Sequence, residues 1–210
     1  MKVSIIGQGY VGLTISAFAA SKHEVVGFDN SQRVVDQLNR GISHIEGVES
    51  EVIARSAKAG RYKATTNGAD IKGSDIVVIA VPTPLTKDRQ PDMTFIEAAC
   101  MTIAENIDRP VLVINESTSF PGTVRTFIKP LIEKLSANKF EHMYAISPER
   151  VDPGRGDYNQ KNTPRLYAGL TPEASEKTRE FYSSFCDQLV EVSSPEVAES
   201  AKLFENTFRQ

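Results

Sequence analysis

The sequence predicts an α/β fold in which helices cover both faces of a doubly wound, mostly parallel sheet. Three observations support this prediction. Short apolar runs rich in β-branched residues alternate with helical segments, a glycine-rich turn joins the first run to the first helical segment, and no repeat or low-complexity linker interrupts the alternation. We expect one domain over residues 1–194, with a small α/β extension after the sixth strand, and the start of a long connecting helix over residues 195–210.

Hydrophobic periodicity places the individual elements. Strands are expected at residues 2–6, 24–28, 62–65, 75–80, 110–114, 142–146, 165–169 and 188–192. Helices are expected at residues 10–21, 31–39, 49–59, 93–107, 121–135, 172–185 and from 195 onward. Residues with N-cap chemistry precede four of these helices, namely Ser31, Asp92, Thr171 and Ser194.

The last expected helix has an apolar stripe and no stop signal. Val197, Ala201, Phe204 and Phe208 share one face, and neither a C′ glycine nor a proline follows. We therefore expect the chain to be truncated inside a helix.

Composition excludes several classes of function. With 40% hydrophobic residues and a net charge of −3, the chain has no basic excess that could hold a nucleic-acid backbone. Its apolar runs are of strand length, too short to span a bilayer, and no signal peptide opens it, so a cytoplasmic protein without a membrane partner is expected. The two cysteines and three histidines are scattered, so no metal site is expected.

The first strand enters the motif Gly7-x-Gly9-x-x-Gly12, and a helix follows at once. In a Rossmann-type fold the first glycine permits a tight turn, the second lets a pyrophosphate approach the backbone, and the third lets helix and strand pack closely. The second strand ends in Asp29, about 20 residues further on, where a carboxylate accepts hydrogen bonds from ribose hydroxyls. Because this carboxylate would repel a 2′-phosphate, the pattern predicts NAD rather than NADP as the cofactor.

Polar residues follow three further strands, at the sheet edge where ligands bind. Thr83 lies in a Pro-Thr-Pro turn, Thr118 in a polar cluster, and Glu149 and Arg150 in a rigid loop. A half-buried glutamate there could act as general base toward water, and the arginine could hold an anion. Simple strand termination, a helix cap and a surface ion pair remain alternatives for these residues taken singly.

In the last helix Lys202, Asn206 and Arg209 share one face, roughly opposite the apolar stripe. A lysine beside an amide can stabilise a developing oxyanion. Spacing alone favours the alternative, a solvated helix face with Glu205–Arg209 and Glu199–Lys202 ion pairs.

Together these pieces resemble the UDP-glucose/GDP-mannose dehydrogenase family, most closely its N-acetylated branch of UDP-N-acetylglucosamine and UDP-N-acetylmannosamine 6-dehydrogenases. The motifs that carry the resemblance are GQGYVG (7–12), VPTPLTKDRQPDM (81–93), ESTSFPGT (116–123), SPERVDPG (147–154) and ESAKLFENTFR (199–209).

The resemblance implies a two-step, NAD-dependent oxidation of a sugar C6 alcohol to a carboxylate for surface polysaccharide, in a homodimer. It implies that Lys202, Asn206, Glu149 and Thr118 are catalytic. The implied cofactor-binding residues are Gly7, Gly9, Tyr10, Val11, Gly12, Asp29, Thr83 and Thr118. The implied UDP-sugar contacts are Arg150, Val151, Lys202, Asn206 and Arg209.

Two features of the family are missing from the sequence: the glycine-rich segment with the nucleophilic cysteine, and the UDP-binding C-terminal domain. Cys100 and Cys186 both fit core packing better than catalysis. The chain is therefore expected to bind NAD without turning over a sugar. A single-step β-hydroxyacid dehydrogenase and a non-catalytic NAD-sensing module remain alternatives; Thr118 and Glu149 argue against the first, because one hydride transfer has no use for water-handling residues.

Overall fold

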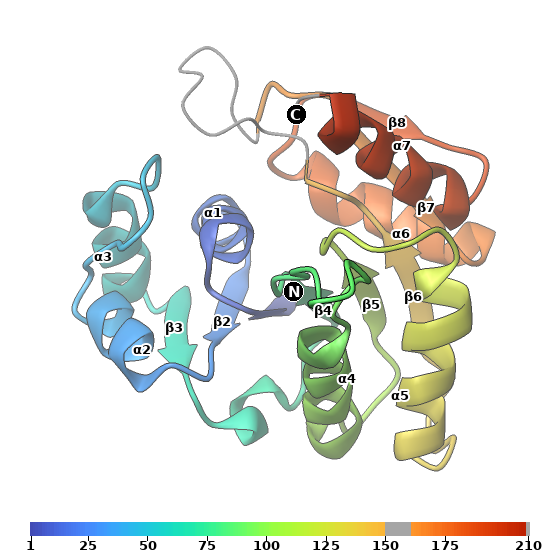
Figure 1. The fold of residues 1–210 in the computed structure, drawn as a ribbon. Helices are drawn as coiled ribbons and strands as arrows, with labels where there is room; N and C mark the ends of the chain where they lie inside the picture. The colour runs from blue at the N-terminus through green and yellow to red at the C-terminus, as the bar shows by residue number, and fades with distance from the viewer. Residues whose placement is uncertain (150–160, 209–210) are drawn as a thin grey trace.

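The computed structural model describes residues 1–149 and 161–208, and their strands form one sheet in the order β3-β2-β1-β4-β5-β6-β7-β8 (Figure 1). Neighbours from β3 to β6 are parallel, β7 runs antiparallel to β6, and β8 is parallel to β7. The strands are β1 (Lys2–Ile6), β2 (Glu24–Phe28), β3 (Tyr62–Thr65), β4 (Ile76–Ile79), β5 (Leu112–Asn115), β6 (Met143–Ile146), β7 (Arg165–Gly169) and β8 (Leu189–Glu191). The predicted doubly wound, mostly parallel sheet is confirmed.

The helices also follow the expected order along the chain. They are α1 (Tyr10–Ala19), α2 (Gln32–Asn39), α3 (Ser50–Lys58), α4 (Thr94–Asn106), α5 (Lys129–Leu135), α6 (Pro172–Ser183) and α7 (Pro195–Phe208). One short element was not expected, a 3₁₀ turn at Gly68–Ile71, which is too short to leave a hydrophobic period in the sequence. The helix expected at residues 121–135 is present, but its first part, Val124–Ile128, is a π-helical turn that leads into α5.

The predicted helix caps are only partly confirmed. Thr171 caps α6, because its hydroxyl accepts a hydrogen bond from the Ala174 N–H. Ser31 precedes α2, but its side chain makes no capping hydrogen bond. Asp92 lies one residue before the N-cap position of α4, and its carboxylate accepts from the Thr94 N–H at 3.0 Å. The turn chemistry is thus present at α4, displaced by one residue.

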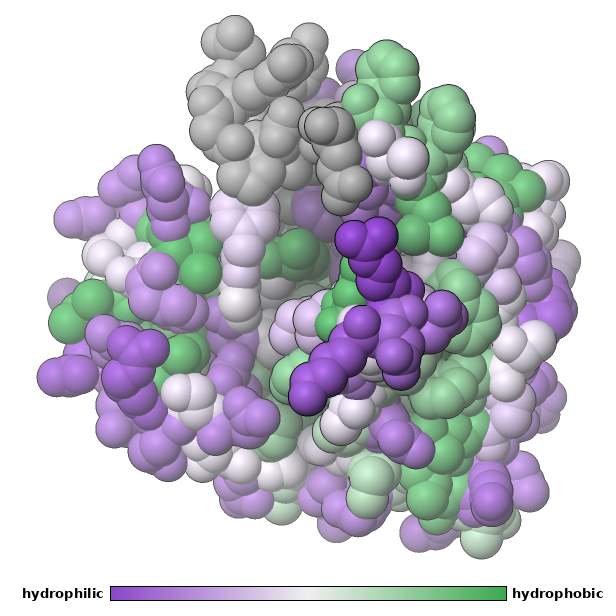
Figure 2. Space-filling view, in the orientation of Figure 1, coloured by the Kyte–Doolittle hydropathy of each residue, from purple (hydrophilic) through white to green (hydrophobic). Residues whose placement is uncertain are grey.

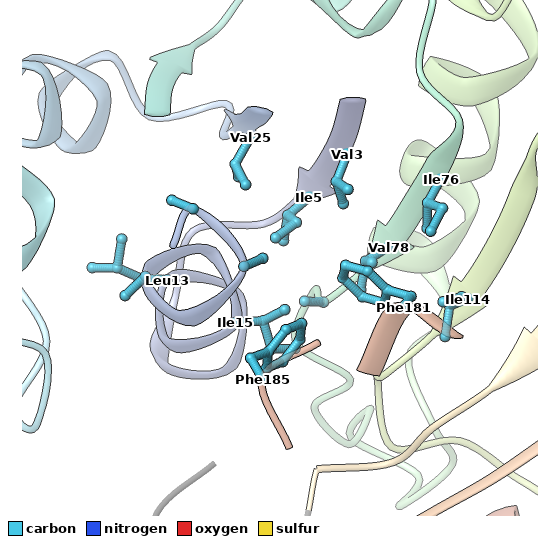
Figure 3. Close-up of a cluster of buried hydrophobic side chains, with 14 of the residues drawn as sticks. Val3, Ile5, Leu13, Ile15, Val25, Ile76, Val78, Ile114, Phe181 and Phe185 are labelled. Carbon is cyan, nitrogen blue, oxygen red and sulfur yellow. The ribbon is translucent and has the colours of Figure 1, made fainter. Parts of the chain in front are cut away.

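Successive strand residues point to opposite faces of the sheet and contribute to two hydrophobic layers, one on each face. One layer contains residues of α1, α2, α3 and α6, and Figure 3 shows Ile15 of α1 beside Phe181 and Phe185 of the α6 region against the strands. The other layer contains residues of α4, α5 and Ala198 of α7. Helices thus cover both faces of the sheet, as predicted.

The apolar stripe of α7 is on the outside of the protein. Val197, Phe204 and Phe208 are 43%, 74% and 84% exposed, whereas Ala198 and Glu199 are buried. A hydrophobic pattern would ordinarily place the stripe inward; the anchoring of the Glu199 carboxylate, described below, turns the helix the other way. None of the helices described is both long and apolar enough to cross a membrane.

Candidate functional site

The three glycines of the first turn occupy three different environments. Gly7 has a φ of +93°, a left-handed conformation that favours glycine. A Cβ on Gly12 would come within 1.8 Å of the Gly7 carbonyl oxygen, so α1 packs against the turn as closely as a glycine allows. A Cβ on Gly9 would meet nothing within 4 Å, so the backbone there borders open space. These are the three roles expected of a pyrophosphate-binding turn.

The buried side chain of Gln8 supports the glycine turn by hydrogen bonds, a role that the sequence did not predict. Its side chain is fully buried and donates to the carbonyls of Ile5 and Gly7, while its Oε1 accepts from the hydroxyls of Ser16 and Tyr62. A polar side chain between two glycines gives no periodic signal, and its partners lie on α1 and β3. Gln8 therefore fixes the shape of the turn without facing the ligand space.

Asp29 ties the end of β2 to the same turn. Its Oδ2 accepts from the Gln8 N–H at 2.9 Å, and its Oδ1 accepts from the Ser31 N–H at 2.9 Å. Each carboxylate oxygen has a second lone pair, so both can still accept from a ligand hydroxyl. This is the geometry that the predicted ribose contact requires.

A pocket of about 700 Å³ runs from this turn along the carboxyl edge of the sheet. In Figure 2 the same face shows a hollow with hydrophobic surface inside it. Asp29 and Asn30 line one end, and α4 contributes Phe95, Ala98, Ala99 and Thr102. The predicted residues that line the pocket are Gly7, Gly9, Tyr10, Val11, Asp29, Thr83, Thr118, Glu149, Lys202 and Asn206. Gly12 is not among the lining residues, since it packs beneath the turn.

The turns after β4 and β5 are joined to each other at the pocket. The Thr83 hydroxyl donates to the Thr118 carbonyl at 2.6 Å, and the Ser117 hydroxyl donates to the Val81 carbonyl at 2.7 Å. Asn115, at the end of β5, accepts from the Ser117 N–H and donates to the Ser117 carbonyl. The strand-end residues are thus part of a rigid wall, and the predicted positions of Thr83 and Thr118 at this edge are confirmed.

A buried charge cluster lies behind this wall. Arg165 Nη1 donates to Glu116 Oε1 at 2.5 Å and to the Ser147 hydroxyl at 3.0 Å, and Arg165 Nη2 is 3.2 Å from Glu149 Oε2. The Tyr182 hydroxyl also donates to Glu116 Oε1, and the guanidinium lies 4.5 Å from the centre of the Tyr182 ring. Both carboxylates line the pocket, so the cluster joins the ligand space to the interior.

Burial dominates the protonation equilibria of this cluster. Loss of hydration raises the pKa of Glu116 to about 7, although Arg165 and the hydrogen bond from Tyr182 oppose the change. The pKa of Tyr182 rises well above its ordinary value, first because of burial and then because of the neighbouring Glu116. Near neutral pH the cluster therefore holds a neutral tyrosine, a guanidinium and a carboxyl that exchanges a proton.

Helix α7 carries the remaining lining residues. Lys202 and Asn206, one turn apart, both line the pocket. Between the helix and the sheet, the buried Glu199 carboxylate accepts from the backbone N–H groups of Gly122 at 2.5 Å and Val124 at 3.0 Å. This contact fixes the rotation of α7 and aims Lys202 and Asn206 at the pocket. The face of α7 that carries Lys202 and Asn206 therefore lies against the pocket.

Some site residues lie outside the sequence predictions or outside the described residues. Arg150, Val151 and Arg209 were expected to contact substrate, and all three fall in segments that the structure does not describe. Glu116 and Arg165 were not singled out individually. Their pairing joins residues 49 positions apart, and no local spacing reports such a contact.

The residues present fit a dinucleotide. The glycine turn offers open backbone and a helix N-terminus for two phosphates, Asp29 offers acceptors for ribose hydroxyls, and the apolar wall from α4 offers surface for flat rings. At the other end of the pocket, a carboxylate, a hydroxyl, an ammonium and an amide gather around one space. Such a set can take up a proton and stabilise a negatively charged oxygen.

Comparisons with known proteins agree with this geometry. Residues 1–186 match the NAD binding domain of the UDP-glucose/GDP-mannose dehydrogenase family. The chain is 37% identical over 215 residues to the UDP-N-acetyl-D-mannosamine dehydrogenase of Pyrococcus horikoshii, covering 100% of this chain and 50% of the relative. It is 34% identical to the UDP-N-acetyl-D-glucosamine 6-dehydrogenase of Pseudomonas aeruginosa, with the same coverage of 100% and 50%.

A solved structure gives the same result in three dimensions. The UDP-N-acetylmannosamine dehydrogenase of P. horikoshii superposes with a TM-score of 0.91 at 36% identity, over 100% of this chain and 50% of that one. The chain thus spans about half the length of the relatives it matches. With the glycine turn, Asp29 and the strand-end residues in place, the chain belongs to the UDP-glucose/GDP-mannose dehydrogenase family and contains its NAD-binding domain.

Proposed function

We propose that this chain is the NAD-binding portion of a UDP-N-acetylhexosamine 6-dehydrogenase that supplies sugar acids for surface polysaccharide. The observation that carries the proposal is the composition of the two pocket ends. Asp29 and the glycine turn suit the adenosine diphosphate half of NAD, and Thr118, Glu149, Lys202 and Asn206 suit oxidation of an alcohol at the other end. The relatives named above support the N-acetylated substrate class.

Bound NAD⁺ supplies the hydride acceptor for such a reaction. The residues of the chain do the rest of the work in the proposed site. Lys202 accepts the alcohol proton and, with Asn206, donates hydrogen bonds to the oxygen on which negative charge develops. Glu149 takes a proton from water that the Thr118 hydroxyl orients, which suits the hydrolysis of an acyl intermediate. Arg150, Val151 and Arg209 remain proposed contacts to the UDP-sugar.

Neither cysteine of the chain is suited to covalent catalysis. Burial raises the pKa of Cys100 to about 12 and that of Cys186 to about 11, so neither is a thiolate at neutral pH. We therefore expect the 210-residue chain to bind NAD but not to oxidise a UDP-sugar by itself. We also propose that residues 1–194 form the NAD-binding unit, and that residues from 195 begin a helix that connects to a UDP-binding domain in a homodimeric enzyme.

Titration calorimetry and a turnover assay test these statements together. The chain should bind NAD more tightly than NADP, and it should produce no continuous NADH when UDP-N-acetylglucosamine or UDP-N-acetylmannosamine is added. Tighter binding of NADP would contradict the role of Asp29. Sustained NADH production would contradict the need for a further segment. Reading the source gene past the codon for Gln210 gives a third test, because the proposal requires a glycine-rich segment with a cysteine downstream.

A further inference from the structure

Thr102 is a polar side chain on an otherwise apolar wall of the pocket. The described residues of α4 that line the pocket are Phe95, Ala98, Ala99 and Thr102. Of these four, only Thr102 has a side chain that forms hydrogen bonds, and it is half-buried. In ligand sites, a few polar groups placed on an apolar surface fix the orientation of the ligand and provide specificity. Thr102 is therefore a candidate for such a role on the α4 side of the pocket.

The hydroxyl of Thr102 presents lone pairs to the pocket, because its proton is already used. It donates to the Ala98 carbonyl at 3.0 Å, one turn back in the same helix. Ala98 and Thr102 both line the pocket, so this hydrogen bond lies on the ridge of α4 that borders the ligand space. A hydroxyl has one proton and two acceptor lone pairs. Thr102 can therefore accept a hydrogen bond from a ligand while it keeps its bond to the helix.

Thr102 lies at the end of the pocket where a dinucleotide would place its base. Asp29, the expected ribose contact, is flanked by Phe28 and Asn30, and all three line the pocket. Phe28 packs against the hydrophobic layer that contains residues of α4, whereas the residues of α1 belong to the layer on the opposite face of the sheet. A dinucleotide with its pyrophosphate at the turn before α1 and its ribose at Asp29 therefore directs its base between the end of β2 and α4.

The two polar side chains nearest to this space after Asp29 differ in what they can select. Asn30 is exposed, and its amide offers both a donor and an acceptor, so it can pair with either kind of group on a base. Thr102, with its proton held by Ala98, offers an acceptor. An acceptor on an apolar wall favours a ring that carries an N–H group at that point over a ring that carries none. Adenine has such a group, the 6-amino group.

We propose that Thr102 recognises the base of the bound dinucleotide by accepting a hydrogen bond from the 6-amino group of adenine, while the apolar residues of α4 and β2 contact the faces of the ring. This inference rests on the binding of NAD in the orientation of the proposed function. It assigns the recognition of the base to α4, whereas Asp29 and the glycine turn bind the ribose and the phosphates. The ligands selected by Thr102 are thus 6-aminopurine nucleotides.

One change in the ligand combined with one change in the protein tests this contact. The ligands are ADP and purine riboside 5′-diphosphate, which differs from ADP in lacking the 6-amino group. Thr102→Val replaces the hydroxyl with a methyl group of similar size. The ratio of ADP affinity to analogue affinity, measured by titration calorimetry, should be about two- to tenfold higher in the native chain than in this variant, which is the range for one neutral hydrogen bond. Other effects of the amino group are the same in both proteins and cancel.

Thr102→Ser is the matched control, because serine keeps a hydroxyl that can donate to the Ala98 carbonyl. This variant should keep the native ratio, and Thr102→Val should bind the analogue as tightly as the native chain does. Equal weakening of both ligands by Thr102→Val would overturn the inference, because it would show a packing role alone. An equal loss of the ratio in Thr102→Ser and Thr102→Val would also overturn it, because the hydroxyl would not be the cause.

A titration of the native chain with NAD separates this inference from the proposed function. If NAD binds and the ratio for ADP and its analogue is the same in the native chain and in Thr102→Val, the inference is overturned and the proposed function stands. If the native chain binds neither NAD nor ADP, the function and the inference are overturned together. NAD itself should bind about two- to tenfold more weakly to Thr102→Val than to the native chain.

Discussion

The stability of the folded chain should depend on pH through Glu116, and the size of the effect follows from its burial. The ordinary pKa of this carboxyl is 4.5, and burial raises it to about 7 in the folded protein. Because the folded state holds the proton more tightly than the unfolded state, the stabilising contribution is fully present below about pH 4.5 and is lost as pH rises through about 7. One pKa unit corresponds to about 1.4 kcal/mol, so the complete change is about 3 kcal/mol.

Urea unfolding of the native chain and of Glu116→Gln isolates this contribution. The amide mimics the protonated carboxyl and does not titrate, so all other groups cancel in the difference between the two free energies of unfolding. Between about pH 5 and about pH 8 the native chain should lose about 2.5 kcal/mol relative to the variant. Glu105→Gln, at an exposed position of α4, should track the native chain at both values. A difference between native chain and Glu116→Gln that stays constant with pH would refute the reasoning, because it would mean that the buried carboxyl does not change its protonation on unfolding.

Three further predictions concern the turn, the ribose contact and the last helix. Gly12→Ala places a methyl group against the Gly7 carbonyl oxygen, so it should destabilise the fold by about 1–3 kcal/mol and abolish NAD binding. An unchanged melting temperature together with an unchanged NAD affinity would contradict the close packing at this position. Asp29→Asn should weaken NAD binding and reduce the ratio of NAD affinity to NADP affinity measured by calorimetry. An unchanged ratio would show that Asp29 does not discriminate between the two cofactors. Glu199→Ala leaves the backbone N–H groups of Gly122 and Val124 without acceptors, so urea unfolding should show a loss of about 1–3 kcal/mol; the isosteric Glu199→Gln, which keeps one acceptor, should lose less, and equal losses would argue against the hydrogen bonds as the cause.

The sequence was sufficient for those parts of the protein that depend on local order. Apolar runs placed the strands, because strand residues buried on both faces leave continuous β-branched segments. The spacing of Gly7, Gly9 and Gly12 predicted the turn, because each position needs a glycine for a different steric reason. The strand-end positions of Thr83 and Thr118 followed from the parallel sheet, whose carboxyl ends meet at one edge.

Features that depend on distant contacts could not be predicted in this way. The pairing of Glu116 with Arg165 requires β7 to run antiparallel to β6, and strand direction leaves no trace in the composition of β7. The contact that sets the rotation of α7 was also beyond reach, because the Glu199 carboxylate accepts from Gly122 and Val124, which are 77 and 75 positions away along the chain. In both cases a charged side chain is buried against a partner far along the chain, and no local spacing reports such a contact.

Because Glu199 is anchored, the number of residues that follow it in α7 determines which side of the helix carries Lys202 and Asn206. Each residue added to an α-helix advances it by about 100° around its axis. An insertion between Glu199 and Asn206 would swing the amide to another side of the helix while the carboxylate stayed on Gly122 and Val124. Length changes in the linker between β8 and Pro195 do not have this effect, because Glu199 can keep its hydrogen bonds to Gly122 and Val124 and α7 keeps its rotation. Natural variation in length should therefore accumulate upstream of Glu199 and be absent from the roughly two helical turns between Glu199 and Asn206.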